Sequence, residues 1–314
     1  MRKKTCVVFF LLCALLGSLA AQEPVRNSLP APAPAPADKI RVRVDLVNVL
    51  MTVTNKRNRL ELGLAKEDLR VFEDGQPQTI RYFSRETDLP LRIGVLVDTS
   101  SSIRDRLRFE QEAAIDFLNT TLRRGKDLAF VLAFDVQPQV VQDYTDDLEK
   151  LSGAIRGLLA GGVTTLYDAI HFSCREKMLF FPPPEPYLRR VMIVISDGQD
   201  NQSDHTREEA LAMAQHAEVT IYAVSTSATG LPGRGDKVLR RLAEQTGGRA
   251  FFPFKASETA ADFREIAREL RSQYSLAYTS TNRAHDGTFR TIAIQPLQKD
   301  LRVRAKPGYY APSE

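Results

Sequence analysis

Three short groups of oxygen-bearing side chains are the part of this sequence whose residue types and spacing fit a chemical role. The first is Asp98-x-Ser100-x-Ser102, a carboxylate and two hydroxyls at intervals of two residues. The second lies within Gly161–Asp168, where two glycines precede a threonine, and the third within Ile195–Gly198, where an aspartate follows an apolar run. Together they offer two carboxylates and three hydroxyls. Such hard oxygen ligands suit Mg²⁺, Mn²⁺ or Ca²⁺ rather than zinc.

Each group falls at the end of an expected strand or in a loop beside one. Ile93–Val97 is apolar, rich in β-branched residues and too short for a helix, and Asp127–Phe134 and Val191–Ser196 share this character. Amphipathic segments separate these runs, so the pattern predicts a parallel sheet with helices on both faces, which gathers ligands at the carboxyl ends of its strands. We expect helices over 107–122 (with Phe109 on the apolar face), 148–159, 166–180, 207–218, 237–246 and 259–271, further strands at 219–225 and 250–252, and a short edge strand at Val140–Val141. The charge-rich residues 264–271 are expected to face solvent.

Both ends of the chain have the period-two pattern of β-strands. Residues 40–54 form one long or two staggered strands, and residues 69–73 and 78–84 form a hairpin around a turn at Asp74-Gly75. Strands are also expected in the tail at 276–279, 288–294 and 301–304. Because each half alone leaves sheet edges open, we expect the two ends to build one small β-sandwich beside the α/β domain. The predicted boundaries are 39–88 for the N-terminal β module, 89–273 for the α/β domain and 274–314 for the C-terminal β segment.

The N-terminus has the composition of an export signal. Met1–Ala21 combines a basic start, an apolar core too short to span a bilayer and small residues at its end, although an uncleaved anchor is the alternative. Residues 22–38 follow as a stiff Pro/Ala linker. We therefore expect an exported protein, periplasmic or secreted, with no transmembrane segment after removal of the signal. Its removal leaves a formal charge of +1 (4 − 3), which does not suggest nucleic acid, and one cysteine, Cys174, expected as a buried small hydrophobe.

In this arrangement the chain resembles a von Willebrand factor type A domain over about residues 89–271. That family holds a metal in a metal-ion-dependent adhesion site (MIDAS) made by DxSxS, a threonine and an aspartate. These fall on the residues Asp98, Ser100, Ser102, Thr164 and Asp197. The resemblance implies a Rossmann-like, doubly wound, mostly parallel sheet with one antiparallel edge strand, and a binding domain rather than an enzyme.

The layout is also similar to a group of bacterial exported proteins with a domain related to von Willebrand factor A. In that group a β-rich segment ends in an EDG turn, here Glu73–Gly75, and a GYYAP sequence, here Gly308–Pro312, closes the domain. The adhesion site implies a divalent cation, with Mg²⁺ preferred and Mn²⁺ or Ca²⁺ as alternatives. An Asp or Glu carboxylate from a protein partner would fill its open position. The spacing to the following helix favours Thr164 over the adjacent Thr165 as the ligand.

Three classes of function follow from these patterns: a metal-dependent binding module, a structural component of a cell-envelope assembly with a non-exchanging metal-supported contact, and an enzyme. The enzyme is disfavoured. A DxDx phosphotransferase would need aspartate at Ser100, and the sequence has neither a G-x-S-x-G elbow nor a phosphate-binding P-loop. Loop-capping, helix-start or packing roles, rather than metal ligation, are expected for Asp135, Asp168, Asp200, Asn201, His171, His205, His216 and His285.

Overall fold

The computed structural model describes residues 46–85, 88–179, 188–227, 233–253 and 255–313, all within one compact unit, Val44–Glu314. The expected signal at 1–21, the linker at 22–38 and the start of the first strand at 40–45 lie outside these residues. No helix in the described ranges has the length and apolar character needed to cross a membrane.

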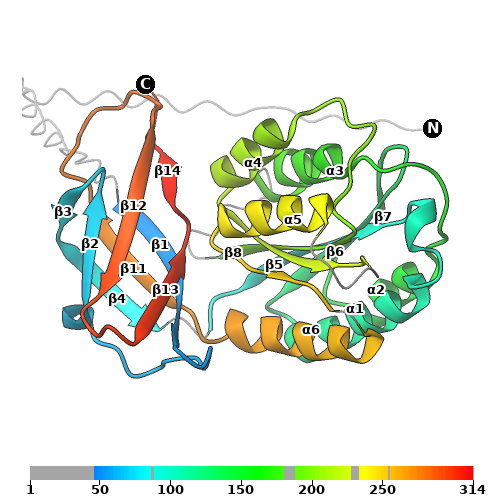
Figure 1. The fold of residues 1–314 in the computed structure, drawn as a ribbon, viewed down its shortest axis with the longest axis horizontal. Helices are drawn as coiled ribbons and strands as arrows, with labels where there is room; N and C mark the ends of the chain where they lie inside the picture. Colours follow the sequence, from blue (N-terminus) through cyan, green and yellow to red (C-terminus); the bar gives the residue numbers. More distant parts are fainter. Residues whose placement is uncertain (1–45, 86–87, 180–187, 228–232, 254, 314) are drawn as a thin grey trace, which may run out of the picture. The chain divides into compact units, whose positions relative to one another are not determined.

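A six-stranded sheet forms the centre of the α/β domain, with the strand order β10-β9-β8-β5-β6-β7 (Figure 1). The central strand β5 is buried along its whole length, as its continuous apolar run predicts. All neighbouring pairs are parallel except β6 and β7, so β7 is the expected antiparallel edge strand, longer than predicted. The strands are β5 (Leu91–Asp98), β6 (Leu128–Phe134), β7 (Pro138–Thr145), β8 (Arg189–Ser196), β9 (Val219–Ser225) and β10 (Ala250–Phe251).

Helices cover both faces of this sheet and bury two separate apolar cores. Figure 1 shows α3 (Leu166–Phe172), α4 (Arg207–His216) and α5 (Arg234–Glu244) on one face. The other face carries α1 (Leu107–Thr121), α2 (Leu148–Arg156) and α6 (Ala256–Leu270). The prediction of a doubly wound α/β fold is therefore confirmed.

Two local predictions about the helices are wrong and one is confirmed. The helix expected over 166–180 is regular only to Phe172 and continues to Leu179 as a π-helix, which accommodates the fully buried Cys174. Cys174 is thus the expected small hydrophobe. Phe109 does not lie on the apolar face of α1, because 38% of its surface is exposed.

The β-sandwich is built from both ends of the chain, as predicted. One sheet has the order β13-β1-β11-β4 and the other β14-β12-β2-β3. Strand β1 lies between two C-terminal strands, β11 and β13, and β2 pairs with β12. Apolar residues that alternate along β1 and β11, such as Val49 and Leu276, fill the core between the sheets. The strands are β1 (Leu46–Asn55), β2 (Leu69–Glu73), β3 (Gln76–Gln78), β4 (Ile80–Arg85), β11 (Tyr274–Thr279), β12 (Phe289–Pro296), β13 (Leu301–Ala305) and β14 (Gly308–Tyr310).

The hairpin predicted for residues 69–84 is correct only in its first part. Strand β3 pairs with β2 around the turn at Asp74-Gly75, where both residues have positive φ. After Thr79 the chain changes sheet, and β4 pairs with β11. The change of sheet allows this short segment to contribute to both layers of the sandwich.

Helix α6 joins the α/β domain to the sandwich through a buried carboxylate. Glu269 Oε1 accepts hydrogen bonds from the Tyr222 hydroxyl at 2.6 Å and from the Thr52 hydroxyl of β1 at 3.0 Å, and it also pairs with Arg304 of β13. Only 3% of Glu269 is exposed. The expectation that residues 264–271 face solvent is therefore wrong at this end of the helix.

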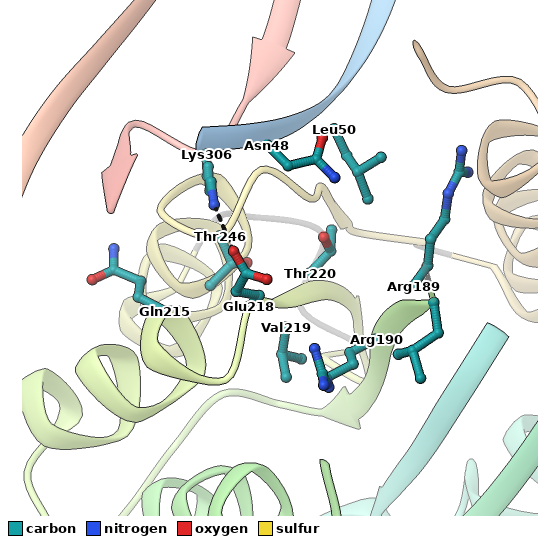
Figure 2. Close-up of a pocket in the computed structure, with 11 residues that line it drawn as sticks. Asn48, Leu50, Arg189, Arg190, Gln215, Glu218, Val219, Thr220, Thr246 and Lys306 are labelled. Atoms are coloured by element: carbon teal, nitrogen blue, oxygen red, sulfur yellow. Dashed lines mark hydrogen bonds and ion pairs between the residues drawn. The ribbon is translucent and has the colours of Figure 1, made fainter. Parts of the chain in front are cut away.

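A second contact between the two parts surrounds a small hollow of about 70 Å³. Figure 2 shows Lys306 reaching toward Glu218, with Asn48 and Leu50 of β1 nearby. The ammonium of Lys306 lies 3.2 Å from the Glu218 carboxylate. This exposed ion pair contributes little stability, since water screens it.

Candidate metal centre

The five residues singled out in the sequence lie at the carboxyl edge of the central sheet. Asp98 is the last residue of β5, and Asp197 follows β8 directly. Ser100 precedes and Ser102 lies within a single turn of 3₁₀-helix, Ser101–Ile103, between β5 and α1, and Thr164 lies just before α3. Strand β5 pairs with β8, so the two aspartates come from neighbouring strand ends.

The carboxylate of Asp98 is fixed in position by donors on both of its oxygens. Its Oδ1 accepts from the backbone N–H of Ser100 at 2.9 Å, and its Oδ2 accepts from the Ser196 hydroxyl at 2.7 Å. Asp98 is fully buried. Burial raises the pKa of this carboxyl and nearby Asp197 adds to the effect, while the hydrogen bonds from Ser196 and Ser100 oppose it. A cation beside Asp98 would stabilise its charged form.

The two serine hydroxyls link Asp98's turn to the second aspartate. Ser100 Oγ and Ser102 Oγ are 2.9 Å apart, and Ser102 Oγ donates to Asp197 Oδ2 at 3.0 Å. Neighbouring oxygens around an octahedral Mg²⁺ are about 3.0 Å apart, because each lies at about 2.1 Å from the ion. The spacing of these oxygens therefore fits a small, hard divalent cation.

Thr164 lies in a loop that packs against the same turn without bonding to the other four side chains. The Gly162 carbonyl accepts from the backbone N–H of Ser101 at 3.3 Å, and Gly161 N–H donates to the Thr99 carbonyl at 2.6 Å. Asn201 holds Thr164 itself, because its side chain accepts from Thr164 N–H at 3.1 Å and its N–H donates to the Thr164 carbonyl at 3.2 Å.

The hydroxyls of the two adjacent threonines have different partners. Thr165 Oγ1 donates to the Asp135 carbonyl at 2.9 Å, whereas the Thr164 hydroxyl has no hydrogen-bond partner among the described residues. Thr164 is 4% exposed. A hydroxyl without a hydrogen-bond partner among the described residues is available to a metal ion, and Thr164 as a ligand stays a prediction.

Polar residues around the centre have mainly structural partners. The Asp168 carboxylate accepts from the backbone N–H groups of Asp204 and His205 at 3.0 and 2.9 Å, and lies 2.7 Å from a ring nitrogen of His205. Asp200 accepts from Tyr167 N–H at 3.0 Å, at the start of α3. His171 stacks on His205 with ring centroids 3.8 Å apart. No group of three or more His, Cys, Asp or Glu side chains that could hold a metal is found in the described ranges.

Two residues near the centre were missed by the sequence analysis. Ser196 is fully buried and, besides holding Asp98, accepts from Gly198 N–H at 3.0 Å. Glu110 in α1 is buried close enough to Asp98 and Asp197 to feel their charges. The position of Ser196 at the end of a buried strand could have indicated its role beside Asp98. Glu110 is a lone glutamate in an amphipathic segment, and nothing in the sequence indicates that it is buried.

Close backbone packing fixes the loop that carries Asp197. Gly198 has φ of +75°, and a Cβ atom there would lie 2.3 Å from the carbonyl oxygen of Gly235 in α5. A Cβ at Gly235 would in turn lie 2.1 Å from the Asp197 carbonyl oxygen. Only glycine fits at both positions, so the start of α5 sets the position of Asp197.

Part of the chain matches a model of a known protein family. Residues 93–199 match the family model described as von Willebrand factor type A domain. This range includes all five candidate ligands. None of the curated proteins compared with the chain matches it.

Solved structures of the same fold share little sequence with this chain. A von Willebrand factor type A protein from Catenulispora acidiphila has a TM-score of 0.50 at 13% identity, covering 86% of this chain and 74% of that one. Proximal thread matrix protein 1 from the mussel byssus, solved with zinc in its MIDAS motif, has a TM-score of 0.50 at 17% identity. That match covers 63% of this chain and only half of the mussel protein. At these identities the likeness shows the fold alone.

Proposed function

We propose that this chain, of which residues 93–199 match the von Willebrand factor type A family model, is an exported protein-binding module that recognises an acidic group on a partner through a divalent cation. Domains of this family are typically interaction modules rather than enzymes. The proposed ligands are Asp98, Ser100, Ser102, Thr164 and Asp197, with Mg²⁺ as the preferred ion.

The arrangement of four oxygen-bearing side chains around one turn carries this proposal. Asp98 accepts hydrogen bonds on both of its oxygens. The hydroxyl oxygens of Ser100 and Ser102 are 2.9 Å apart, and the Ser102 hydroxyl lies 3.0 Å from Asp197 Oδ2. A cation that replaces these hydrogen bonds would find its ligands already in place. Hydroxyl oxygens are neutral, so they leave more of the ion's positive charge uncompensated than a cage of carboxylates would.

The exposure of the residues indicates where a partner would bind. Asp98 and Ser100 are buried, at 0% and 2% exposure, while Ser102 is exposed and Asp197 half-buried. The cation would therefore be held from the inside of the domain and open on the outer side. A carboxylate from a partner can bind there and supply the negative charge that the hydroxyls do not.

Export is the part of the proposal that rests on sequence alone. The signal-like residues 1–21 and the Pro/Ala linker at 22–38 would deliver the module to the periplasm or the exterior and separate it from whatever precedes it. A binding module that works through a free divalent cation suits this location.

Calorimetric titration of Mg²⁺, Mn²⁺, Ca²⁺ and Zn²⁺ tests the metal site directly. The wild-type protein is expected to bind at least Mg²⁺, and Asp98→Ala to lose this binding while its circular dichroism spectrum stays unchanged. Asp135→Ala is the matched control, since Asp135 also follows a strand end but holds its own loop. Equal binding by wild type and Asp98→Ala would refute the site.

Selection from a random peptide library tests the acidic partner. Peptides retained in Mg²⁺ and released by EDTA are expected to share an Asp or Glu, and exchange of that residue for its amide should abolish binding. The alternative function, a structural component of an envelope assembly, predicts instead that the protein purified with its partners stays assembled in EDTA.

A further inference from the structure

Glu110 is deeply buried, and one of its carboxyl oxygens has no hydrogen-bond partner among the described residues. It lies in the first turn of α1, where 4% of its surface is exposed. Its Oε2 atom is buried without a hydrogen-bond partner, and no described residue bonds to Oε1 either. Burying a charged carboxylate in this way is costly, so the group must be protonated or must have a cation nearby.

The charged groups around Glu110 come from three elements of the domain. Arg106 precedes the same helix, Asp98 ends β5, and Asp197 follows β8. The guanidinium of Arg106 is largely engaged elsewhere, since it donates to the carbonyls of Thr226 and Ser227 at 2.8 and 2.9 Å. The Glu110 carboxyl thus lies close enough to Asp98 and Asp197 for their charges to act on it, in the helix that follows the turn with Ser100 and Ser102.

The buried surroundings of Glu110 favour its protonated, neutral form. Burial is the main cause that raises the pKa of Glu110 to about 8; Arg106 opposes it, and the charges of Asp98 and Asp197 add to it. At neutral pH the carboxyl therefore carries a proton for most of the time. A divalent cation between the two aspartates would reverse the local field and favour the carboxylate.

Glu110 is not a further ligand. Among the described residues, no group of three or more His, Cys, Asp or Glu side chains is arranged to hold a metal, so we do not count Glu110 with Asp98 and Asp197 as a ligand. Any influence of Glu110 on a bound cation must act through space, across the buried interior, where charges interact more strongly than in water.

We propose that Glu110 is a positioning residue of the metal centre that exchanges its proton for the charge of the cation. It holds the proton while the site is free of metal, and releases it to solvent when the cation binds. The carboxylate then faces the ion from inside the domain and strengthens its binding. This inference rests on the cation binding proposed above.

Linkage gives this exchange a measurable pH dependence. A cation that favours ionised Glu110 binds more tightly as the pH rises toward 8, by up to tenfold per pH unit where one proton is released. This gain in cation affinity disappears at lower pH, because removing the proton from Glu110 then costs more free energy than its interaction with the cation returns. Glu110→Gln cannot ionise, so its affinity should lack this part of the pH dependence.

The test compares Mg²⁺ binding by wild type and Glu110→Gln in calorimetry at pH 6, 7 and 8. We expect the affinity of the variant to be about tenfold lower at pH 8 and nearly equal to that of wild type at pH 6. Titrations in buffers of different ionisation enthalpy should show more proton release by wild type at pH 7. Glu110→Asp keeps an ionisable group and should keep the release.

Two controls separate this role from a structural one. Glu112→Gln removes an exposed charge two residues away, which pairs with Arg156 at 3.2 Å, and should behave as wild type. The thermal midpoint of Glu110→Gln in EDTA at pH 7 should be higher than that of wild type, because the Glu110 carboxyl ionises on unfolding and so favours the unfolded state of wild type, whereas glutamine has no proton to lose. A lowered midpoint, or equal affinity and proton release in Glu110→Gln and Glu112→Gln, would overturn the inference while leaving the metal site intact. Absence of binding by wild type would overturn both.

Discussion

At the scale of single residues, two aspartates buried at opposite ends of the central strands have pKa values shifted in opposite directions. Asp98 and Asp127 are both fully buried. The pKa of Asp98 is raised, mainly by burial, and no cationic side chain among the described residues contributes to lowering it. Burial also pushes the pKa of Asp127 upward, but hydrogen bonds from Arg123 and the Leu91 N–H, with the charge of Arg271, outweigh it and lower the pKa. The first carboxylate is suited to an added cation, and the second already has its cations in the chain.

This difference predicts that Asp127→Asn destabilises the protein strongly. Asp127 accepts from Leu91 N–H and Arg123 N–H, each at 2.8 Å, and pairs with Arg271. Loss of one partner from such a buried pair costs about 3–5 kcal/mol. Urea unfolding at pH 7 measures the loss, and Asp116→Asn on the exposed side of α1 should stay within about 0.5 kcal/mol of wild type.

The acid limb of the stability profile should change with the same substitution. The folded-state pKa of Asp127 is lowered, so its ionised form contributes stability above the unfolded-state value of about 3.9. This contribution is lost as the pH falls through the lower folded-state value. The unfolding free energy of wild type should therefore fall more steeply below pH 4 than that of Asp127→Asn. Parallel profiles would contradict the assignment.

At the scale of elements, the metal centre depends on how closely α5 approaches the loop after β8. Gly198→Ala would place a Cβ atom 2.3 Å from the Gly235 carbonyl oxygen and strain a residue at φ +75°. We expect a loss of about 2–4 kcal/mol and weaker Mg²⁺ binding, because Asp197 must move. Chemical unfolding and cation titration measure the two effects.

Gly153→Ala in α2 is the matched control for that substitution. A Cβ atom at Gly153 meets nothing within 4 Å, so alanine should stabilise the helix by up to about 1 kcal/mol and leave metal binding unchanged. If both glycine variants behave alike, the close approach of α5 does not position Asp197.

The elements that carry the site could be predicted from sequence because each is defined locally. The apolar runs of β5 and β8 stop at Asp98 and Ser196, and the polar residues that follow mark the carboxyl edge. The change of sheet at Thr79 and the π-helix after Phe172 could not be predicted, since both depend on which distant strands and side chains pack there. The burial of Glu110 and Glu269 escaped for the same reason, because charged residues in a helix give no sign of a buried partner.

At the scale of the whole molecule, the two ends of the chain depend on each other. Strand β1 has C-terminal strands on both sides, and β2 pairs with β12. A chain ending at Ser272 would leave both without these partners and expose the core around Val49 and Met51. We expect residues 46–85 of this shortened chain to exchange their amide hydrogens rapidly, compared with slow exchange in the full chain. Slow exchange in both would show that the N-terminal β module is independent.

The pairing of β4 with β11 has a consequence for how the protein could be engineered. Arg85 and Tyr274 are directly paired, so the chain leaves the sandwich and returns to it at neighbouring positions, about 4.8 Å apart as in any sheet. The entire α/β domain is thus a cassette inserted into a hairpin. A short turn could close the hairpin in its place, and another domain whose termini lie side by side could be grafted at the same junction.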